Sequence, residues 1–466
     1  MTDRSHSVLD ELAQHNPVPV EGLGDSWAAP GARHLLSDIT SHSRIAAPPP
    51  WDDLSWDDPI VAGGRFRSIR TPLFTAASLA ACAALVVGIL SLSAGSPSKN
   101  AASTWALAGD ITSVSWNPST GAGYQSGASL ECPSSSTCYA TVDPTGSPGP
   151  FEIEVSHDGG ATWQQSALPA GVGSNGPIDC VSATNCETIG VAVTGKTASY
   201  SLLMTNDGGA TWTEIPFGPE LPPDVSPTDV SCTTATSCFA SFISLDANGT
   251  GVVMATSNGG RTWTSSSTLP PGFQPLAVEC FTGGHCIVTG DRDDTSGMAL
   301  YSTDGGTSWV PATVPARIGL LGLDSLSCES GSECLALTTA SATGASPNVV
   351  AATTDGGVTW TLTSDGGLPS GAQPYTLSCA LGGPCWIGGW LVTSPTPQLV
   401  GGPQPSLLAM STDGGQTWQA SQLASSLSQG AVTSVSCPDA TSCYAMEMQG
   451  NESGHAMTAA LLSYGS

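Results

Sequence analysis

"STDGGTSW", residues 302–309, returns five more times with small changes along a chain of 466 residues. The other copies are SHDGGATW at 156–163, TNDGGATW at 205–212, TSNGGRTW at 256–263, TTDGGVTW at 353–360 and STDGGQTW at 411–418. Each copy lies between two short strand-like stretches, such as SLLMT before one and TWTEIPF after it, so each is predicted to be a hairpin turn. A motif that recurs about every 50 residues indicates a repeat fold.

The residue types of this motif predict how the turn is built. The carboxylate or amide at its third position should accept hydrogen bonds from backbone N–H groups two residues on. The glycine pair permits positive φ, a Thr or Ser hydroxyl closes the turn from the far side, and the Trp packs on the neighbouring sheet. The predicted structural residues are Asp158, Trp163, Asp207, Trp212, Asn258, Trp263, Asp304, Trp309, Asp355, Trp360, Asp413 and Trp418.

Fourteen of the fifteen cysteines form seven pairs with the same C-x5-C spacing. Each pair flanks a five-residue loop between two strand-like runs, which brings the two residues opposite each other and predicts one hairpin disulfide per repeat. Such bonds are expected on the exported side of a membrane. Zinc is a poor alternative because His is scarce there and no C-x2-C spacing occurs, so we expect no metal and no cofactor. The predicted pairs are Cys132 with Cys138, Cys180 with Cys186, Cys232 with Cys238, Cys280 with Cys286, Cys328 with Cys334, Cys379 with Cys385, and Cys437 with Cys443.

Seven cysteine pairs but six turn motifs leave one turn missing. The chain ends in MTAALLSYGS, which supplies a third strand and then stops, whereas STW at 103–105 matches the start of every fourth strand. We therefore predict that the segment around Trp105 completes the last repeat and closes a ring. The predicted fold is all-β, a seven-bladed β-propeller over residues 102–466.

The repeated pattern S-x-D-x-G-x-T-W resembles the bacterial neuraminidase repeat, or Asp box. This motif occurs in sialidase-like and sortilin-like β-propellers, in some xyloglucan-cleaving glycosidases and in photosystem assembly factors. The resemblance covers about residues 100–466 and implies that the boxes are structural. Asn258 in place of Asp departs from the pattern and implies a slightly weaker turn.

Residues 71–94 are predicted to form a transmembrane signal-anchor helix. No charge occurs from Thr71 to Ser98, and Arg65, Arg67 and Arg70 precede the apolar run. By the positive-inside rule, residues 1–70 stay in the cytoplasm, and the propeller is exported after a linker at 95–101. The alternative, a cleaved signal peptide, fits poorly with so long a leader. The segments ELAQHNPVP and ARHLLSDIT are similar to juxtamembrane segments of actinobacterial single-pass membrane proteins.

The predicted cytoplasmic tail is rich in Pro, Asp and Ser. Its segment 48–59, PPPWDDLSWDDP, is either a disordered spacer or a docking motif in which Trp51 and Trp56 anchor a basic partner. The whole chain has a net charge of −27 and only 11 Lys and Arg, which excludes nucleic acid as an expected partner.

Function is predicted from the loops opposite the boxes. Sialidase chemistry needs three arginines in one pocket, and the exported part has only Arg261, Arg292 and Arg317, of which Arg261 lies in a box. A glycoside hydrolase with two carboxylates stays open as the alternative. We expect instead a binding or scaffold module for a glycan or protein ligand. The candidate ligand-binding residues are Asp291, Arg292, Asp293, Asp294, Arg317, Trp386 and Trp390, although Trp386 could equally be a core residue of its strand.

Overall fold

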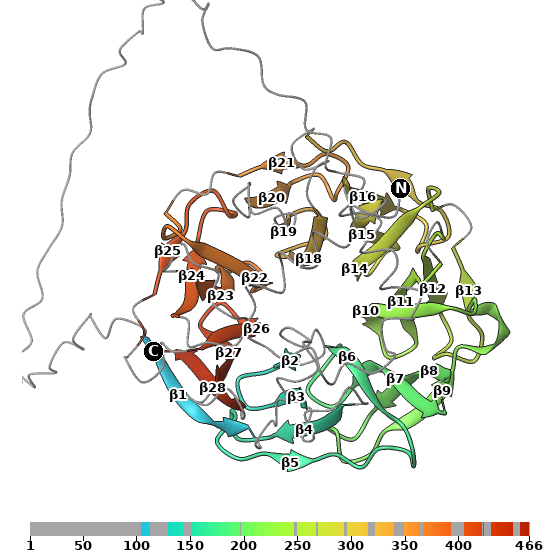
Figure 1. Cartoon of the computed structure of the whole chain (residues 1–466), viewed down its shortest axis with the longest axis horizontal. Helices are drawn as coiled ribbons and strands as arrows, with labels where there is room; N and C mark the ends of the chain where they lie inside the picture. The colour runs from blue at the N-terminus through green and yellow to red at the C-terminus, as the bar shows by residue number, and fades with distance from the viewer. Residues whose placement is uncertain are drawn as a thin grey trace, which may run out of the picture. The chain divides into compact units, whose positions relative to one another are not determined.

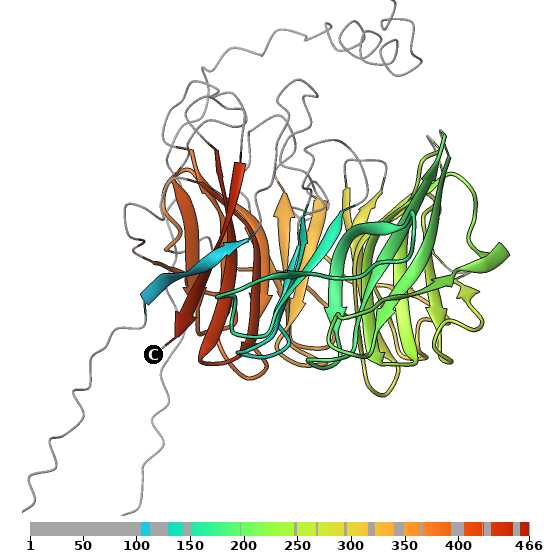
Figure 2. The ribbon, with the colours of Figure 1, turned by 90° about the horizontal axis from the view of Figure 1, so that it is seen from below.

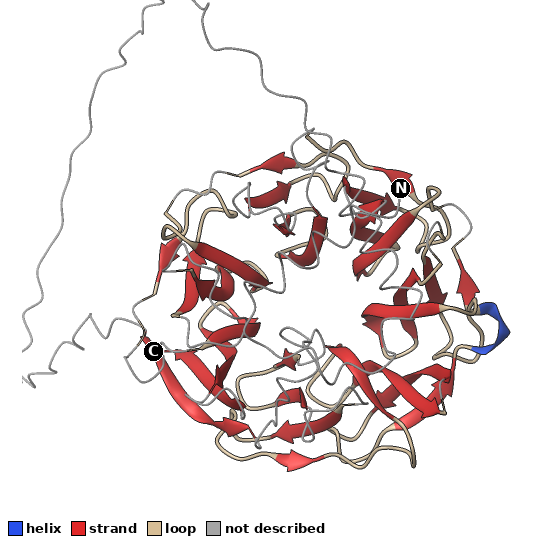
Figure 3. Cartoon of the chain, viewed as in Figure 1, coloured by secondary structure: helices blue, strands red, loops and turns tan. Residues whose placement is uncertain are grey.

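The computed structural model describes residues 104–111, 129–142, 151–195, 197–246, 249–266, 269–292, 296–315, 322–339, 349–363, 367–392, 405–421, 423, 430–450 and 457–465. These residues form seven four-stranded antiparallel sheets set around a central axis (Figure 1). Seen from the side, the strands run between the two faces of the ring (Figure 2). The described elements are almost all strands (Figure 3); the exception is the 3-10 helix η3 (Gly218–Glu220). The predicted seven-bladed propeller is confirmed.

Blades 1 to 3 follow one another along the chain, each with its first strand nearest the axis. Blade 1 contains β2 (Leu130–Glu131), β3 (Cys138–Val142), β4 (Glu152–Ser156) and β5 (Gln164–Gln165). Blade 2 contains β6 (Gly173–Cys180), β7 (Cys186–Thr194), β8 (Thr197–Thr205) and β9 (Thr213–Pro216). Blade 3 contains β10 (Val225–Thr234), β11 (Ser237–Ser244), β12 (Val252–Thr256) and β13 (Thr264–Ser265).

Blades 4 to 6 repeat the same strand order. Blade 4 contains β14 (Phe273–Phe281), β15 (His285–Arg292), β16 (Ser296–Ser302) and β17 (Val310–Pro311). Blade 5 contains β18 (Gly322–Cys328), β19 (Cys334–Thr339), β20 (Val349–Thr353) and β21 (Thr361–Leu362). Blade 6 contains β22 (Ala372–Cys379), β23 (Cys385–Leu391), β24 (Ser406–Ser411) and β25 (Gln419–Ala420).

Blade 7 is assembled from both ends of the propeller. It contains β26 (Ala431–Asp439), β27 (Ser442–Gly450) and β28 (Met457–Gly465), and its outer strand is β1 (Thr104–Ile111). β1 pairs antiparallel with β28, with Thr104 opposite Gly465 and Trp105 opposite Tyr464. Trp105 is buried and takes the place that the box Trp has in other blades. The predicted closure is therefore confirmed, and β28 continues to Gly465.

All seven predicted disulfides are present. Each joins neighbouring strands of one blade across its first hairpin, with Cα–Cα distances of 3.9 to 4.1 Å. Each hairpin tip is thereby held closed beside the axis. The bonded pairs are Cys132 with Cys138, Cys180 with Cys186, Cys232 with Cys238, Cys280 with Cys286, Cys328 with Cys334, Cys379 with Cys385, and Cys437 with Cys443.

The strand register around the disulfides differs between blade 4 and blade 7. In blade 4, Cys280 on β14 lies directly opposite Cys286 on β15, as the hairpin prediction requires. In blade 7, the register of β26 and β27 shifts after Ser436, and Cys437 bonds to Cys443 within this irregularity. The Cα–Cα distance is 4.1 Å in both blades, so the irregular hairpin holds its cysteines as close as the regular one.

Burial follows the position of a strand within its blade. The second and third strands, such as β3 (CYATV) and β12 (VVMAT), are buried on both faces because blades stack face to face. The short outer strands, such as β5 and β13, are exposed. Among the described residues, no helix has the length and apolar character needed to cross a membrane. The predicted anchor at 71–94, the tail at 1–70, the linker at 95–101 and Cys82 lie outside the described residues.

Candidate functional site

The cysteine hairpins and the Asp boxes lie on one face of the ring, the disulfide face. The first box glycine donates its backbone N–H to a carbonyl in the cysteine hairpin of the same blade, as Gly159 does to Ser136 at 2.9 Å and Gly259 to Thr236 at 2.8 Å. Equivalent bonds occur in blades 2, 4 and 5. These hydrogen bonds join the two kinds of turn on one face, and each turn supports the other.

Each Asp box is held by hydrogen bonds from within the box. In the first copy, the Thr162 N–H donates to Asp158 Oδ1 at 2.8 Å and the Thr162 hydroxyl donates to Asp158 Oδ2 at 2.6 Å. These bonds and one from the Ser156 hydroxyl lower the pKa of Asp158 to about 2. The Asp158 carboxylate accepts from the backbone N–H four residues further along the chain, so the prediction that the donor lies two residues further was wrong. Because its oxygens are already engaged, the box carboxylate is structural.

Asn258 keeps the same geometry in the third box. Its Oδ1 accepts from the Thr262 N–H at 3.0 Å, and its Nδ2 donates to the Thr262 hydroxyl at 2.8 Å. The amide thus replaces one accepted bond with a donated one, and the turn is retained.

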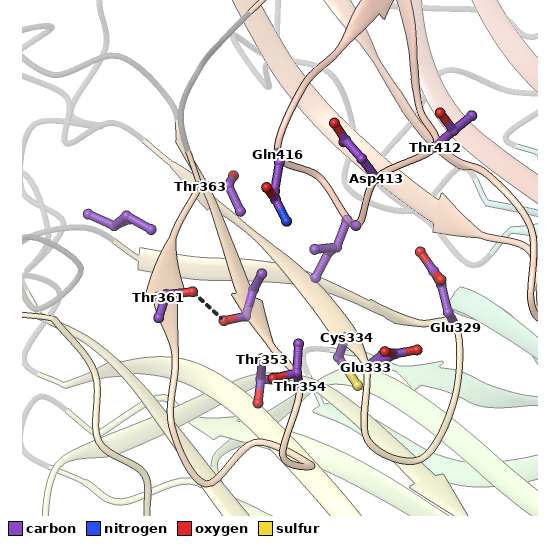
Figure 4. Close-up of a pocket in the computed structure, with 14 residues that line it drawn as sticks. Glu329, Glu333, Cys334, Thr353, Thr354, Thr361, Thr363, Thr412, Asp413 and Gln416 are labelled. Atoms are coloured by element: carbon purple, nitrogen blue, oxygen red, sulfur yellow. Dashed lines mark hydrogen bonds between the residues drawn. The ribbon is translucent and has the colours of Figure 1, made fainter. Parts of the chain in front are cut away.

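A groove of about 590 Å³ opens on the disulfide face between blades 5 and 6. Glu329 and Glu333 from the cysteine hairpin of blade 5 line one side, and Asp413 and Gln416 from the box of blade 6 line the other (Figure 4). The floor carries threonine side chains, among them Thr361, whose hydroxyl donates to the Ala352 carbonyl at 3.3 Å. The groove is acidic and accessible from solvent.

A smaller groove of about 390 Å³ lies at the equivalent place between blades 3 and 4. Most of its lining residues occupy the same repeat positions, with Asp304 in the place of Asp413. Thr233 and Ser237 stand where blade 5 has Glu329 and Glu333. The repeat therefore builds the groove, and the two glutamates distinguish blades 5 and 6. Partial burial and then the neighbouring Glu333 raise the pKa of Glu329.

A second cavity, of about 440 Å³, is the axial channel at the disulfide face. Hydrogen bonds at this channel join each of several blades to the next. The residue before the first cysteine of one blade accepts the backbone N–H of the first cysteine in the following blade. Ser327 accepts from Cys379 at 2.9 Å, and Ser436 accepts from Cys132 at 2.8 Å. This ring of side chains links adjacent blades around the axis. The residues at this position all face the channel: Glu131, Asp179, Ser231, Glu279, Ser327, Ser378 and Ser436.

Carboxylates concentrate on one side of this channel, in blades 1 to 4. Burial raises the pKa of Glu131 to about 8, of Asp179 to about 6 and of Asp229 to about 7. The pKa of Glu279 lies well above its usual range, because of burial first and then the nearby charges of Asp179, Asp229 and Glu131. Among the described residues that line the channel, none is basic.

The residues predicted to bind a ligand are not gathered in one place. Asp291 and Arg292 end β15 in blade 4, at the face opposite the disulfides, as expected. Trp386 follows Cys385 directly, is 1% exposed, and packs edge-on against Trp105 at 5.1 Å between ring centroids. The alternative interpretation of Trp386 as a core residue is confirmed. Trp390, at the other end of the same strand, lies 5.8 Å from the Tyr375 ring.

Asp293, Asp294 and Arg317 lie outside the described residues. A ligand-binding role for Asp291, Arg292 and Trp390 stays a prediction. Sequence reasoning missed the groove glutamates and the axial carboxylates. A signal was present, because an acidic residue directly before or after the first cysteine recurs at Glu131, Asp179, Glu279 and Glu329.

Two groups of carboxylate and sulfur atoms come within 4.8 Å of one another in the described part of the chain. They are Glu187 with Cys232 and Cys238, and Glu329 with Cys379 and Cys385. In both groups the sulfur atoms form a disulfide, so no thiolate is available as a metal ligand.

Two family models match the sequence. The model described as photosynthesis system II assembly factor YCF48 matches residues 152–274, and the model of the BNR/Asp-box repeat matches residues 409–420. No curated protein matches the chain.

Several solved structures are similar to the chain at low sequence identity. YCF48 bound to a D1 peptide is 16% identical, with a TM-score of 0.49 over 78% of this chain and 97% of that chain. YCF48 from Cyanidioschyzon merolae is 12% identical, with a TM-score of 0.47 over 78% and 99% of the two chains. A GH74 xyloglucanase from Xanthomonas campestris is 13% identical, with a TM-score of 0.40 over 70% and 66%. The recurring boxes and the seven blades agree with the two family models, and the chain is a seven-bladed β-propeller that carries BNR/Asp-box repeats.

Proposed function

We propose that the propeller is a binding or scaffold module that holds a protein segment carrying basic side chains in the groove between blades 5 and 6. The observation that carries this proposal is the pair of glutamates, Glu329 and Glu333, on one side of an open groove; Asp413 on the other side adds its negative charge while its oxygens stay bonded within the box. Negative charges on both sides of the groove attract a cationic side chain and speed its encounter with the surface. The match of residues 152–274 to a family of assembly factors supports a protein ligand.

The lining of the groove favours a peptide over a glycan. Sugar rings commonly bind against an aromatic face, and among the described residues that line this groove none carries an aromatic ring. Threonine hydroxyls in the lining can accept hydrogen bonds from the N–H groups of a peptide backbone. A glycan ligand is therefore the less favoured choice.

The proposed location is the outer side of a cell membrane, with the propeller exported behind an anchor at residues 71–94. Seven disulfides support an oxidising compartment. The charge-free run after Arg70 supports the anchor. Fractionation of cells with the N-terminus and C-terminus tagged separately, followed by protease protection, tests both statements.

The alternative function, a carbohydrate-active hydrolase, would use two carboxylates near each other, one of them with a raised pKa. Glu329 beside Glu333 meets that description, because the pKa of Glu329 is raised. A hydrolase would release reducing sugar from a polysaccharide panel and would lose this activity on substitution of either glutamate. The binding proposal expects no such turnover.

Exchanging the two equivalent grooves tests the binding proposal. The full-length protein is screened on a peptide array that varies Lys and Arg content, and positive peptides are titrated in solution. The double substitution Glu329→Thr with Glu333→Ser gives blade 5 the residues of blade 3 and should weaken binding about tenfold or more at low salt. The reciprocal substitution Thr233→Glu with Ser237→Glu should create binding at blades 3 and 4. Binding that ignores both exchanges and salt would contradict the proposal.

A further inference from the structure

One repeat position differs in blade 2 from all other blades. The residue after the second cysteine is apolar or aromatic in six blades, namely Tyr139, Phe239, Ile287, Leu335, Trp386 and Tyr444. Each of these side chains packs into the interface with the next blade, close to the Trp of that blade. Leu335 lies in one apolar cluster with Trp418, and the Trp386 ring packs directly against the Trp105 ring. In blade 2 this residue is Glu187.

Glu187 is buried as completely as its apolar counterparts. It is 0% exposed, and neither carboxyl oxygen has a hydrogen-bond partner within the part of the chain that the structure describes. An ionised carboxyl group in such a place is strongly unfavourable, because it loses its water without gaining a partner. The geometry alone therefore favours a protonated Glu187.

Other residues of blade 2 do the packing that residue 187 does elsewhere. The Phe217 ring lies 4.6 Å from the Trp263 ring of blade 3, between centroids. A Cβ atom added at Gly260 would meet Ile215 at 2.6 Å, whereas at the equivalent Gly415 it would meet Leu335 at 3.0 Å. The interface between blades 2 and 3 is thus closed by residues near β9, which leaves position 187 open to a titratable group.

The groups that face Glu187 come from three directions. On β6, Asp179 lies directly opposite it in the strand register, so the two side chains leave the same face of the sheet. On β8 its partner is Met204, and from blade 3 it meets the Cys232–Cys238 disulfide, which does not titrate. Burial and then the Asp179 charge raise the pKa of Glu187 to about 8. Asp179 in turn lies near the axial carboxylates Glu131, Asp229 and Glu279.

We propose that the interface between blades 2 and 3 is a proton-dependent contact, closed while Glu187 holds its proton and loosened when the proton leaves. In the closed state the neutral carboxyl group fits an apolar interface beside the Cys232–Cys238 disulfide. On opening, water reaches the group, the proton passes to solvent, and the carboxylate repels Asp179. This regulation does not depend on the groove between blades 5 and 6.

The direction of the effect follows from the pKa of Glu187, which is about 8 in the closed state and near 4.5 in water. Below pH 4.5 both states hold the proton and the closed state keeps its full stability. Between pH 4.5 and 8 only the open state releases the proton, so opening becomes more favourable by up to about tenfold per pH unit. The interface is therefore tightest in acid.

Hydrogen exchange at two equivalent amides tests this proposal in the full-length protein. The Cys232 N–H donates to Asp179 in the interface of blades 2 and 3, and the Cys379 N–H donates to Ser327 at 2.9 Å in that of blades 5 and 6. The ratio of their exchange rates at one pH removes most of the intrinsic pH dependence. From about pH 5 to about pH 8 this ratio should rise roughly tenfold or more in the unsubstituted protein.

Two substitutions separate the proton from the packing. Glu187→Gln keeps the shape and Glu187→Leu supplies the residue type of blade 5; both should reduce the rise to the smaller part that the raised pKa of Asp179 contributes. Glu214→Gln, at an exposed position on β9, should leave the rise intact. A flat ratio in the unsubstituted protein, or an equal rise in Glu187→Gln, overturns the proposal. So does suppression of the rise by millimolar Ca²⁺, because the carboxylates would then form a cation site.

Discussion

The interfaces between blades 2 and 3 and between blades 5 and 6 hold equivalent places in the ring, yet they are filled by different parts of their blades. Blades 5 and 6 meet through Leu335, which stands directly after a cysteine and packs with Trp418. Blades 2 and 3 meet through Phe217 and Ile215, while Glu187 occupies the position of Leu335. The difference shows that a repeat fold fixes the backbone and the burial of a position but not its chemistry. A polar residue is tolerated there when a neighbouring strand supplies the missing packing.

The largest expected effect is at Phe217. This ring is 2% exposed and contacts both Phe242 and Trp263, so Phe217→Ala should destabilise the protein by about 3–5 kcal/mol. The measurement is denaturant unfolding followed by tryptophan fluorescence, with disulfides intact. A cost below about 1 kcal/mol would mean that Phe217 is not what joins blades 2 and 3.

The next effect compares the two equivalent residues directly. Leu335→Ala removes a buried leucine and should cost about 2–5 kcal/mol. Glu187→Ala at about pH 7 should be close to neutral or stabilising, because it removes a carboxyl group that has no hydrogen-bond partner among the described residues. Equal losses in the two variants would show that residue 187 contributes packing after all.

A smaller effect is the dependence of the melting temperature on pH. The raised pKa values of Glu131, Asp179, Glu187 and Asp229 give stability that is full in acid and is lost as pH rises through about 6 to 8. The lowered pKa values of the box residues Asp158, Asp207 and Asp304, about 2, give stability that is lost only as pH falls from 3.8 toward 2. Thermal melts across pH should therefore peak near about pH 4 to 5. A maximum above about pH 7 would contradict the direction of these shifts.

The smallest effect concerns the one box with an amide. Asn258→Asp restores the carboxylate that the other boxes have, and the Thr262 hydroxyl can then donate to it as Thr162 donates to Asp158. We expect the melting temperature at about pH 7 to rise by about 1 °C, since the turn already forms with Asn. The reverse substitution Asp413→Asn should lower the melting temperature by a similar amount, and changes of the same sign in the two variants would break the equivalence of the boxes.

Much of the fold was predictable because its signals are local. The C-x5-C spacing fixes each disulfide, and STW at 103–105 identifies the closing strand, since both depend on residues a few positions apart. The Asp158 bond partner was misplaced because a turn with two consecutive positive-φ glycines, Gly159 at 71° and Gly160 at 88°, brings residue 162 rather than 160 to the carboxylate.

The candidate site was less predictable because it depends on contacts between blades. Glu329 and Asp413 are 84 positions apart and meet only after blades 5 and 6 stack. Trp386 was a candidate ligand contact, but its ring packs edge-on against Trp105 of the neighbouring blade. Aligning the residue after each second cysteine would have singled out Glu187, as a lone acid in a column of apolar residues.

The pairing of β1 with β28 has a consequence for how the ring is completed. Thr104 and Gly465 lie 361 positions apart, so their pairing closes nearly the longest loop in the propeller. Because closing a long loop costs chain entropy, this pairing should form late in folding. Until it forms, β28 presents an unpaired edge and Trp105 lacks its neighbours Tyr464 and Trp386. At high concentration the waiting edge can take β1 from another molecule instead, so incomplete refolding should yield strand-exchanged dimers rather than open monomers.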